Sequence, residues 1–247
     1  MEELSCLMSK IQKTSAQYGL RLNITKTKWM LVSKTQQPPQ QLILDNERIK
    51  HVDSYIYLGT TVNSNWDQAK EIRIRVEKAR ASFTSMKQIF TSNNLTLPLK
   101  IRVLKCYVFP VLLYGMEAWT MTVTLTKKVE AFEMWSYRHI LRISWTEHVT
   151  NEEVLRRIGK EREVEISIKK KKLEYLGHVM RQNKYRVLQL IVQGKIDSRR
   201  GPGRRRHSWL QNLRQWFGLS SAELFRSAVN KVRIAMLIAN VRNGKDT

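Results

Sequence analysis

Apolar residues recur at helical spacing in the first part of the chain. Leu4, Leu7 and Ile11 fall on one side of an amphipathic helix, which we predict over residues 2–18. Gly19 follows its last turn, and glycine often ends a helix because it accepts a left-handed backbone conformation. The first predicted element is therefore a helix that stops at Gly19.

A strand-like alternation of apolar and polar residues follows. It predicts one strand over residues 20–33 and a second, buried strand over residues 55–59. Between them, residues 42–44 and Ile49 flank Asp45-Asn46, a dipeptide typical of a hairpin turn. We therefore expect a small β portion within the first quarter of the chain.

From residue 65 onward the spacing is helical again. The residues expected to face the core are Ile72, Val76, Ala79, Phe83, Met86 and Phe90. The opposite face carries Arg73, Arg75, Lys78 and Arg80. Thr96 with Pro98 predicts the start of another helix, which Pro110 should bend or end. A further helix is predicted over residues 126–143.

The C-terminal third carries two signatures of helix N-termini. Thr150 with Glu153, and Ser220 with Glu223, match the capping box, in which the first side chain and the last one each bond a backbone N–H of the other. We predict helices over residues 151–158, 163–181, 207–217 and 221–241, with a flexible basic break at 195–206. The expected fold class is mainly α with a small β portion.

The chain is strongly basic. Its 247 residues include 44 lysine and arginine residues against 21 aspartate and glutamate residues, which gives a net charge of +23. More than half of this excess lies between Arg156 and Arg214. Because such a charge repels itself in a folded protein, we expect a polyanionic partner, with RNA or DNA first and an acidic membrane surface second.

Two basic clusters are the candidate phosphate contacts. The first is Lys169, Lys170, Lys171 and Lys172, four consecutive helix positions that encircle the helix. The second is Arg199, Arg200, Arg204, Arg205 and Arg206, in a segment interrupted by glycine and proline. The alternative for each cluster is a solvated charged face or a nuclear import signal. Trp209 either stacks on a base or packs with Leu213 and Trp216, and its helical spacing favours packing.

No catalytic or metal-binding pattern is found among the polar residues. The aspartates are isolated from one another: Asp45, Asp53, Asp67, Asp197 and Asp246. The five histidines lack metal-ligand spacing, and Cys6 and Cys106 are interpreted as two buried thiols without a disulfide. The residues by themselves favour a nucleic-acid-binding module without its own catalytic centre.

Targeting signals are also missing from the pattern. Glu2 and Glu3 stand where a secretory signal needs positive charge. The longest uncharged apolar run, residues 106–116, is too short to span a bilayer. We expect a soluble intracellular protein of the nucleus or cytoplasm, with no membrane partner.

Several blocks, in order, are similar to one family. They are YGLRLNITKTKWM (18–30), YIYLG (55–59), LLYGMEAWTMT (112–122), EAFEMWSYRHILRISWTEHVTNEEVLRRIG (130–159), KLEYLGHVMR (172–181) and GRRRHSWL (203–210). Over nearly its whole length the chain resembles the reverse transcriptases of non-LTR (LINE-type) retrotransposons. That family typically has Cys and Thr where this chain has Met116 and Ala118, which are mild departures.

The resemblance implies three parts. Residues 1–64 would be the end of the palm with its primer-grip hairpin, residues 65–150 the helical thumb, and residues 151–247 a basic helical C-terminal region. Within the thumb, Arg73, Arg75 and Arg80 would lie along the template–primer duplex.

The resemblance also implies roles for residues of the palm. Tyr57, Leu58 and Gly59 match the turn of the primer grip. Lys26 or Lys28 matches the palm lysine, a general acid or phosphate contact during nucleotide addition, with a surface lysine as the alternative.

The family makes DNA on an RNA template with two Mg²⁺ ions, which an aromatic-x-Asp-Asp motif binds. That motif is not among these residues, so we expect no retained cofactor here and Mg²⁺ only in the intact polymerase. The expected function is that of a truncated reverse-transcriptase fragment, inactive alone, which binds RNA and DNA non-specifically through its basic thumb and tail.

Two alternatives stay open. The chain is a domesticated, non-enzymatic nucleic-acid-binding or scaffold protein, or it complements an intact reverse transcriptase in trans. A domain that evolved to stand alone should bury residues 20–62, whereas a truncated palm should expose apolar edges around Leu22, Ile24 and Leu31.

Overall fold

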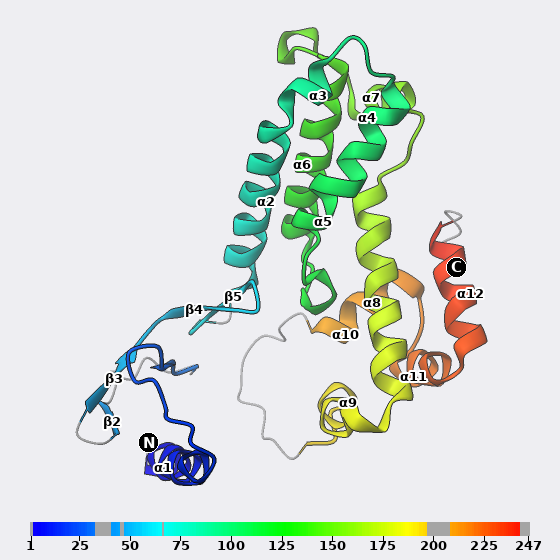
Figure 1. The fold of residues 1–247 in the computed structure, drawn as a ribbon. Coiled ribbons are helices and arrows are strands. Elements are labelled where there is room, and N and C mark those ends of the chain that lie inside the picture. The colour runs from blue at the N-terminus through cyan, green and yellow to red at the C-terminus, as the bar shows by residue number, and fades with distance from the viewer. Residues whose placement is uncertain (1, 33–40, 45–46, 66, 197–207, 243–247) are drawn as a thin grey trace. The chain divides into compact units, whose positions relative to one another are not determined.

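A computed structural model describes residues 2–32, 41–44, 47–65, 67–196 and 208–242. The chain divides into two compact units, Met1–Glu71 and Ile72–Thr247. Strands occur in the first unit, and helices make up most of the described chain (Figure 1). The predicted class, mainly α with a small β portion, is therefore confirmed.

The first unit has a small sheet with a helix packed against it. α1 (Glu2–Gln17) ends as predicted, and Gly19 takes a left-handed φ of 71°. The sheet contains β1 (Lys28–Trp29), β2 (Leu42–Leu44) and β3 (Glu47–His51) in the order β1-β3-β2. β1 is parallel to β3, whereas β2 pairs with β3 in the predicted antiparallel hairpin.

The core of this sheet is small. It consists of Trp29, Leu42, Leu44 and Ile49, against which Met8, Leu22 and Ile24 are partly buried. The sequence prediction that Asp45-Asn46 forms the hairpin turn concerns residues outside the described part. The apolar edge expected around Leu22 and Ile24 is thus partly covered, whereas Leu31 is exposed.

The predicted strand over residues 20–33 is wrong except at β1. Asn23 organises a turn instead, since its side-chain oxygen accepts the N–H of Lys26 at 3.0 Å and its carbonyl accepts the N–H of Thr27 at 2.9 Å. Asparagine side chains compete with sheet pairing in this way, because they mimic the backbone of a turn.

A second hairpin closes the first unit. β4 (Ser54–Tyr57) pairs with β5 (Thr60–Asn63) around the two residues Leu58 and Gly59, both with positive φ. The prediction of a buried strand at 55–59 is wrong, because all four residues of β4 are exposed and Leu58 is 75% exposed. An apolar run of this length does not by itself distinguish a buried strand from an exposed hairpin.

The second unit begins with helices that share an aromatic core. They are α2 (Gln68–Ser85), α3 (Lys87–Thr91), α4 (Leu97–Val103), α5 (Phe109–Leu112) and α6 (Val123–Leu141). Ile72, Ala79, Phe83 and Phe90 are buried, as the stripe predicts. The predicted single helix over this stripe is divided at Met86, which separates α2 from α3.

Between α4 and α5 the helix widens into η1 (Leu104–Val108), a π-helical turn. The N–H of Phe109 donates to the carbonyl of Leu104, five residues earlier. Proline has no N–H to donate to the preceding turn. The disturbance expected at Pro110 therefore takes the form of a wide turn just before it, while Leu104 and Val108 remain buried.

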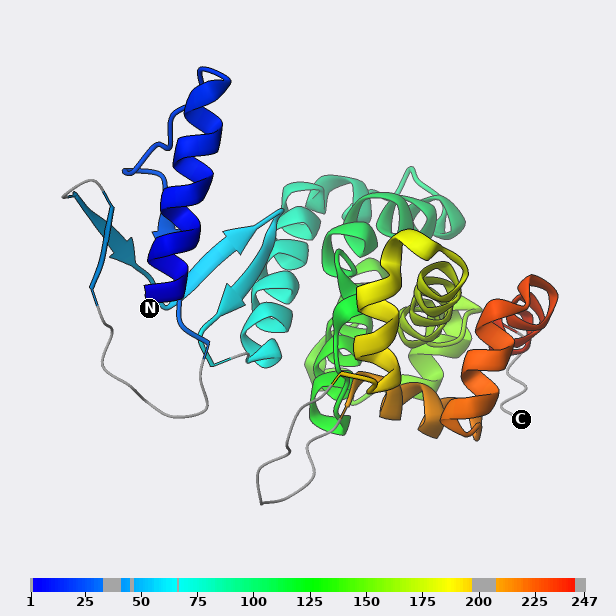
Figure 2. The same cartoon turned by 90° about the horizontal axis from the view of Figure 1, so that it is seen from below.

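The rest of the unit is built around one long helix, α8 (Glu163–Arg181). Before it come η2 (Met116–Ala118), η3 (Trp145–Glu147) and α7 (Asn151–Ile158). After it come η4 (Asn183–Tyr185), α9 (Arg186–Gln193), α10 (Trp209–Phe217), α11 (Ser221–Val229) and α12 (Lys231–Arg242). α9 to α12 all contact α8, and Figure 2 shows them around it.

Most predicted helices of this region are confirmed. α7 and α8 have the predicted bounds, and Ser220 forms the predicted capping box with Glu223. The helix predicted over 221–241 is wrong in one respect, because it breaks at Asn230. The side-chain oxygen of Asn230 accepts the N–H groups of Val232 and Arg233 and so starts a new helix.

The predicted boundaries at 64 and 150 stay predictions. Within the described residues, no helix is long and apolar enough to cross a membrane.

Candidate nucleic-acid interface

Cations and aromatic rings alternate along one face formed by α2 and α6. The guanidinium of Arg80 lies over the ring of Trp135, 5.1 Å from its centroid. The ring of His139 lies 4.2 Å from that of Trp135, one helical turn further along α6. Arg142 follows at the next turn, as the left-handed C-cap of α6. We call Arg80, Trp135, His139 and Arg142 the α2–α6 face.

Buried rings hold this face in place. Phe83 stacks on Phe90 with 4.3 Å between centroids and meets Trp135 edge-on at 4.9 Å. The guanidinium of Arg142 donates to the carbonyl of Thr91, at the end of α3. Arg80, His139 and Arg142 are nevertheless exposed. The face therefore presents positive charge to solvent, part of which Glu77 offsets at 3.8 Å from the guanidinium of Arg80.

The other two arginines predicted on α2 differ from each other. Arg73 is exposed, as expected. Arg75 is 5% exposed, and its guanidinium lies 4.5 Å from the ring centroid of Tyr114. The prediction that Arg75 contacts the duplex is therefore corrected, because its position, three residues after Ile72, places it in the core of the unit.

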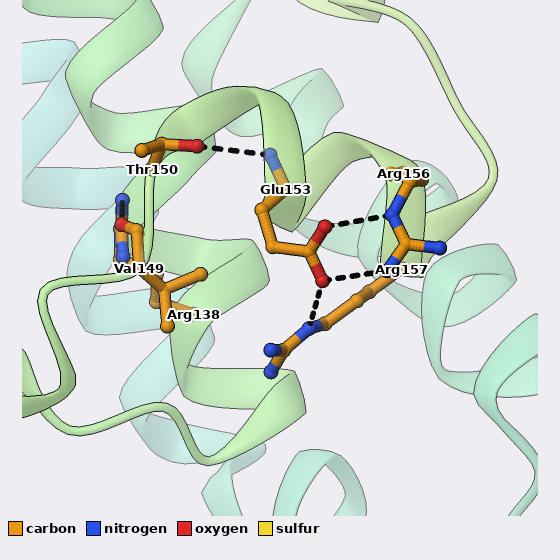
Figure 3. A network of polar contacts seen from close by, with 6 residues as sticks. All are labelled: Arg138, Val149, Thr150, Glu153, Arg156 and Arg157. Atoms are coloured by element: carbon orange, nitrogen blue, oxygen red, sulfur yellow. Dashed lines mark hydrogen bonds and ion pairs between the residues drawn. The ribbon is translucent and has the colours of Figure 1, made fainter.

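A short loop follows the α2–α6 face. η3 stands in this loop, and Trp145 within it is 84% exposed. Arg138 closes the loop from α6, since its guanidinium donates to the carbonyl of Val149 at 2.8 Å and to the side-chain oxygen of Asn151 at 2.9 Å. Figure 3 shows Arg138 beside Val149.

The start of α7 carries the first predicted capping signature. The hydroxyl of Thr150 accepts the N–H of Glu153 at 3.3 Å. The second bond of a capping box, from the N–H of Thr150 to the carboxylate of Glu153, does not form. That carboxylate instead accepts from Arg156 and Arg157 at 2.6 and 2.8 Å (Figure 3). These bonds lower the pKa of Glu153 to about 2, and the bond from Arg156 has the largest effect. The charge of Glu153 offsets part of the positive charge on α7.

The predicted lysine cluster does not form a ring of available charge. Lys169 pairs with Glu165 at 3.2 Å, and Lys170 and Lys171 pair with Glu174 at 3.8 and 3.5 Å. The two pairs with Glu174 are exposed and are worth a few tenths of a kcal/mol each, whereas the side chain of Lys169 is only 14% exposed.

Lys172 is the exception, and its assignment as a phosphate contact is corrected. It is 0% exposed, and its ammonium lies 5.1 and 5.2 Å from the ring centroids of Trp209 and Trp216. It donates to the side-chain oxygen of Asn212 at 3.1 Å. Burial lowers the pKa of Lys172 to about 7. Trp209 accordingly packs as predicted, and its indole N–H donates to the carbonyl of Glu117 at 2.6 Å.

A second buried ionisable group lies at the start of α8. The carboxylate of Glu133, on α6, accepts the N–H groups of Glu163 and Val164 at 2.9 and 3.3 Å and the hydroxyl of Tyr137 at 3.0 Å. Burial raises the pKa of Glu133 to about 7 despite these bonds. It caps α8 from another helix, a role that the local sequence of α8 does not reveal.

The predicted palm residues lie in the first unit. Lys26 is exposed in the Asn23 turn, and Lys28 is exposed on β1, 5.8 Å from the ring centroid of Tyr55. Tyr57, Leu58 and Gly59 form the exposed tip of the β4–β5 hairpin.

Other sequence predictions have mixed outcomes. The prediction that Cys6 and Cys106 are buried is wrong, because both thiols are exposed and free.

Among the described residues no group of three or more His, Cys, Asp or Glu residues has metal-binding geometry. The second basic cluster, Arg199, Arg200, Arg204, Arg205 and Arg206, and most of the break at 195–206 lie outside the described residues.

A groove runs beside α8, with a volume of about 1710 Å³. Residues of α5, α7, α8 and α12 line it, and six basic side chains there face five acidic ones. This balance of charge does not favour a polyanion. The α2–α6 face has the better chemistry for a phosphate backbone, and the sequence signal for it is the spacing of Trp135, His139 and Arg142 by four and three.

Comparison with known proteins finds a distant similarity to a transposon-derived protein. The chain is 29% identical, over 217 residues, to a Caenorhabditis elegans protein provisionally described as an uncharacterized transposon-derived protein. The similarity covers 85% of this chain and 76% of that protein. No protein-family model and no solved structure matches the chain.

Proposed function

From this similarity to a transposon-derived protein, we propose that the chain is a nucleic-acid-binding part of a non-LTR retrotransposon reverse transcriptase. Its partner is the duplex of RNA template and DNA primer, bound mainly through phosphates and without sequence preference. The resemblance of its sequence blocks to that family supports the origin, and the net charge of +23 supports a polyanionic partner.

The observation that carries the proposal is the α2–α6 face. Arg80 and Arg142 are exposed cations held by a ring and by a backbone carbonyl, and both lie on helices packed over the same aromatic core. Cations ordered in advance lose little side-chain freedom on binding a phosphate. Arg73, about two helical turns before Arg80, extends the charge along α2 towards its start.

We assign binding, and not polymerisation, to these residues. The phosphoryl transfer catalysed by the family requires carboxylates that hold Mg²⁺ against the phosphates. No two of the five aspartates are adjacent in sequence. In the same proposal, Lys26 or Lys28 and the Tyr57–Gly59 turn contact the primer, and the arginines at 199–206 add phosphate contacts.

Fluorescence anisotropy with a labelled RNA–DNA duplex, across a salt series, tests the proposal. Each lost phosphate contact should make the slope of log K against log salt shallower by about one unit. The test variants are Arg73→Gln with Arg80→Gln, and Arg204, Arg205 and Arg206→Ala. The matched control is Arg156→Gln with Arg157→Gln, which removes the same charge from a site already paired with Glu153.

The expected result is a shallower slope for both test variants and a smaller change for the control. Absence of duplex binding by the unmodified chain at low salt would overturn the proposal. Equal slopes for the control and for Arg73→Gln with Arg80→Gln would show that the α2–α6 face is not the contact.

A further inference from the structure

Trp145 is a large apolar side chain left almost entirely in water. It is 84% exposed, the highest value among the exposed large hydrophobic side chains of the described residues. Its neighbours in the loop, Ser144, Thr146, Glu147 and His148, are polar and exposed as well. A single indole ring among polar groups is unlike the apolar patches that mark protein or membrane contacts.

The loop that carries Trp145 is fixed from several sides. The N–H of Ser144 donates to the carboxylate of Glu147 at 2.7 Å, and the hydroxyl of Ser144 accepts in return from the N–H of Thr146. Arg142 and His148, on either side, both have left-handed φ values, of 58° and 49°. Arg138 then holds the carbonyl of Val149. The indole is thus presented on an ordered turn, which reduces the entropy lost when it binds a ligand.

The positive charge nearest to Trp145 in the sequence favours a phosphate-bearing ligand. Arg142 is three residues earlier, exposed, and the last member of the α2–α6 face, in which Trp135 and His139 stand between Arg80 and Arg142. The carboxylate of Glu147 is turned to the N–H of Ser144. Cations interleaved with aromatic rings are the pattern by which proteins bind single strands, because every base has a face that can stack.

We propose that Trp145 stacks on an unpaired base of an RNA or DNA strand whose phosphates lie along the α2–α6 face. The inference rests on the proposed function and adds a preference to it. A duplex with a short single-stranded overhang is bound more tightly than the same duplex with a blunt end, because only the overhang offers a free base to the indole.

Three labelled probes and three variants test this. The probes are an RNA–DNA duplex with a blunt end, the same duplex with an overhang of about three nucleotides, and that overhang built from abasic nucleotides. The abasic overhang keeps the phosphates and removes the bases, so it separates stacking from charge. The variants are Trp145→Ala, Trp145→Phe and, as a control on another exposed ring, Tyr107→Ala. Thermal melting of each variant checks that it folds.

We expect the unmodified chain to prefer the normal overhang over both other probes by about 5- to 140-fold, the range for one stacked base. Trp145→Ala should abolish this preference without changing the affinity for the blunt duplex. Trp145→Phe should keep part of it, and Tyr107→Ala all of it.

Contrary outcomes fall into separate classes. If the unmodified chain binds the blunt duplex and shows no preference, the stacking role is wrong and the proposed function stands. If it binds none of the probes, the proposed function fails as well. If Trp145→Ala instead abolishes binding to phosphatidylserine vesicles and leaves the overhang preference intact, Trp145 contacts a membrane surface and the inference is overturned.

Discussion

The side chain of Asn212 binds both backbone groups of Met121. Its oxygen accepts the N–H of Met121 at 2.7 Å, and its amide nitrogen donates to the carbonyl of the same residue at 2.6 Å. Asn212 lies on α10 and Met121 precedes α6, 91 residues away along the chain. The side-chain amide of Asn212 thus gives buried Met121 the pair of hydrogen bonds that a neighbouring β-strand would otherwise provide.

Replacement of Asn212 by alanine should destabilise the second unit. It leaves two buried backbone groups of Met121 unpaired, and each unpaired group costs about 1–3 kcal/mol. We expect the free energy of unfolding to fall by about 2–6 kcal/mol, measured by urea denaturation followed by circular dichroism. Asn93→Ala, at an exposed loop position, is the control and should change it by less than about 0.5 kcal/mol. Similar losses for both variants would contradict the role of Asn212.

Lys172 should make stability depend on pH under alkaline conditions. Burial lowers its pKa to about 7 in the folded protein, against about 10.5 unfolded. Between these values the unfolded chain binds more protons, so stability rises with pH, by at most about 1.4 kcal/mol per pH unit. The two indole faces and Asn212 favour the ammonium, so they limit how far burial lowers the pKa and narrow the pH range over which stability rises.

Lys172→Met tests this dependence, because methionine fills similar space without charge. We expect this variant to be at least as stable as the unmodified chain near pH 7 and to lose the rise in stability between about pH 7 and 10. Lys171→Met, on the exposed side of the same helix, should keep that rise. Urea midpoints measured across this pH range compare the three proteins, and parallel curves for all of them would rule out a titrating Lys172.

Glu133 should act in the opposite direction under mildly acidic conditions. Burial raises its pKa from 4.5 to about 7 in the folded protein. Here the folded chain binds more protons, so stability falls as pH rises from about 4.5 to 7, and the full penalty is present above pH 7. Glu133→Gln keeps an oxygen for the N–H groups of Glu163 and Val164 without the charge.

The Glu133→Gln variant should therefore show a flatter pH dependence of its urea midpoint over that range. Glu133→Ala should lower stability most at acidic pH, where Glu133 is protonated and carries no charge penalty, because both N–H groups lose their partner. Glu152→Gln is the exposed control. A steep fall of stability that persists in Glu133→Gln would assign the pH dependence to another group.

The turn of the β4–β5 hairpin should respond to substitution in opposite directions. Leu58 has a φ of 47°, which costs an ordinary residue about 1 kcal/mol or more, and asparagine tolerates it better. Leu58→Asn should slow hydrogen exchange of the β5 amide groups by about 3- to 5-fold, whereas Gly59→Ala, at a φ of 81°, should speed it. The same direction of change in both variants would contradict the strain at Leu58.

Local rules in the sequence predict most of the helices but not all of their buried polar residues. The caps at Thr150 and Ser220 and the stripe from Ile72 to Phe90 determine where helices begin and which face they bury. The strand predicted at residues 20–33 fails because the side chain of Asn23 competes with sheet pairing.

Lys172, which was predicted to be exposed and is buried, shows what such local rules omit. Lys172 is four residues from both Ile168 and Leu176, which are buried, so its spacing already places it on the apolar face of α8. Its partners, Trp209 and Trp216, lie on α10, and the local sequence around Lys172 does not predict that α10 packs against α8. A run of four lysines suggests a uniform charged surface, whereas a helix places consecutive residues about 100° apart.

The position of Lys172 inside α8 also bears on how the chain is digested. Trypsin cleaves after lysine and arginine, so this basic chain offers it many bonds. Cleavage after exposed Lys195, just past α9, requires little opening, whereas cleavage after Lys172 requires α8 to separate from α10. When opening and closing are fast relative to cleavage, the rate at the Lys172–Leu173 bond reports the equilibrium population of the opened unit. The rate of tryptic cleavage at this one bond in the middle of α8 thus measures the stability of the helices around it.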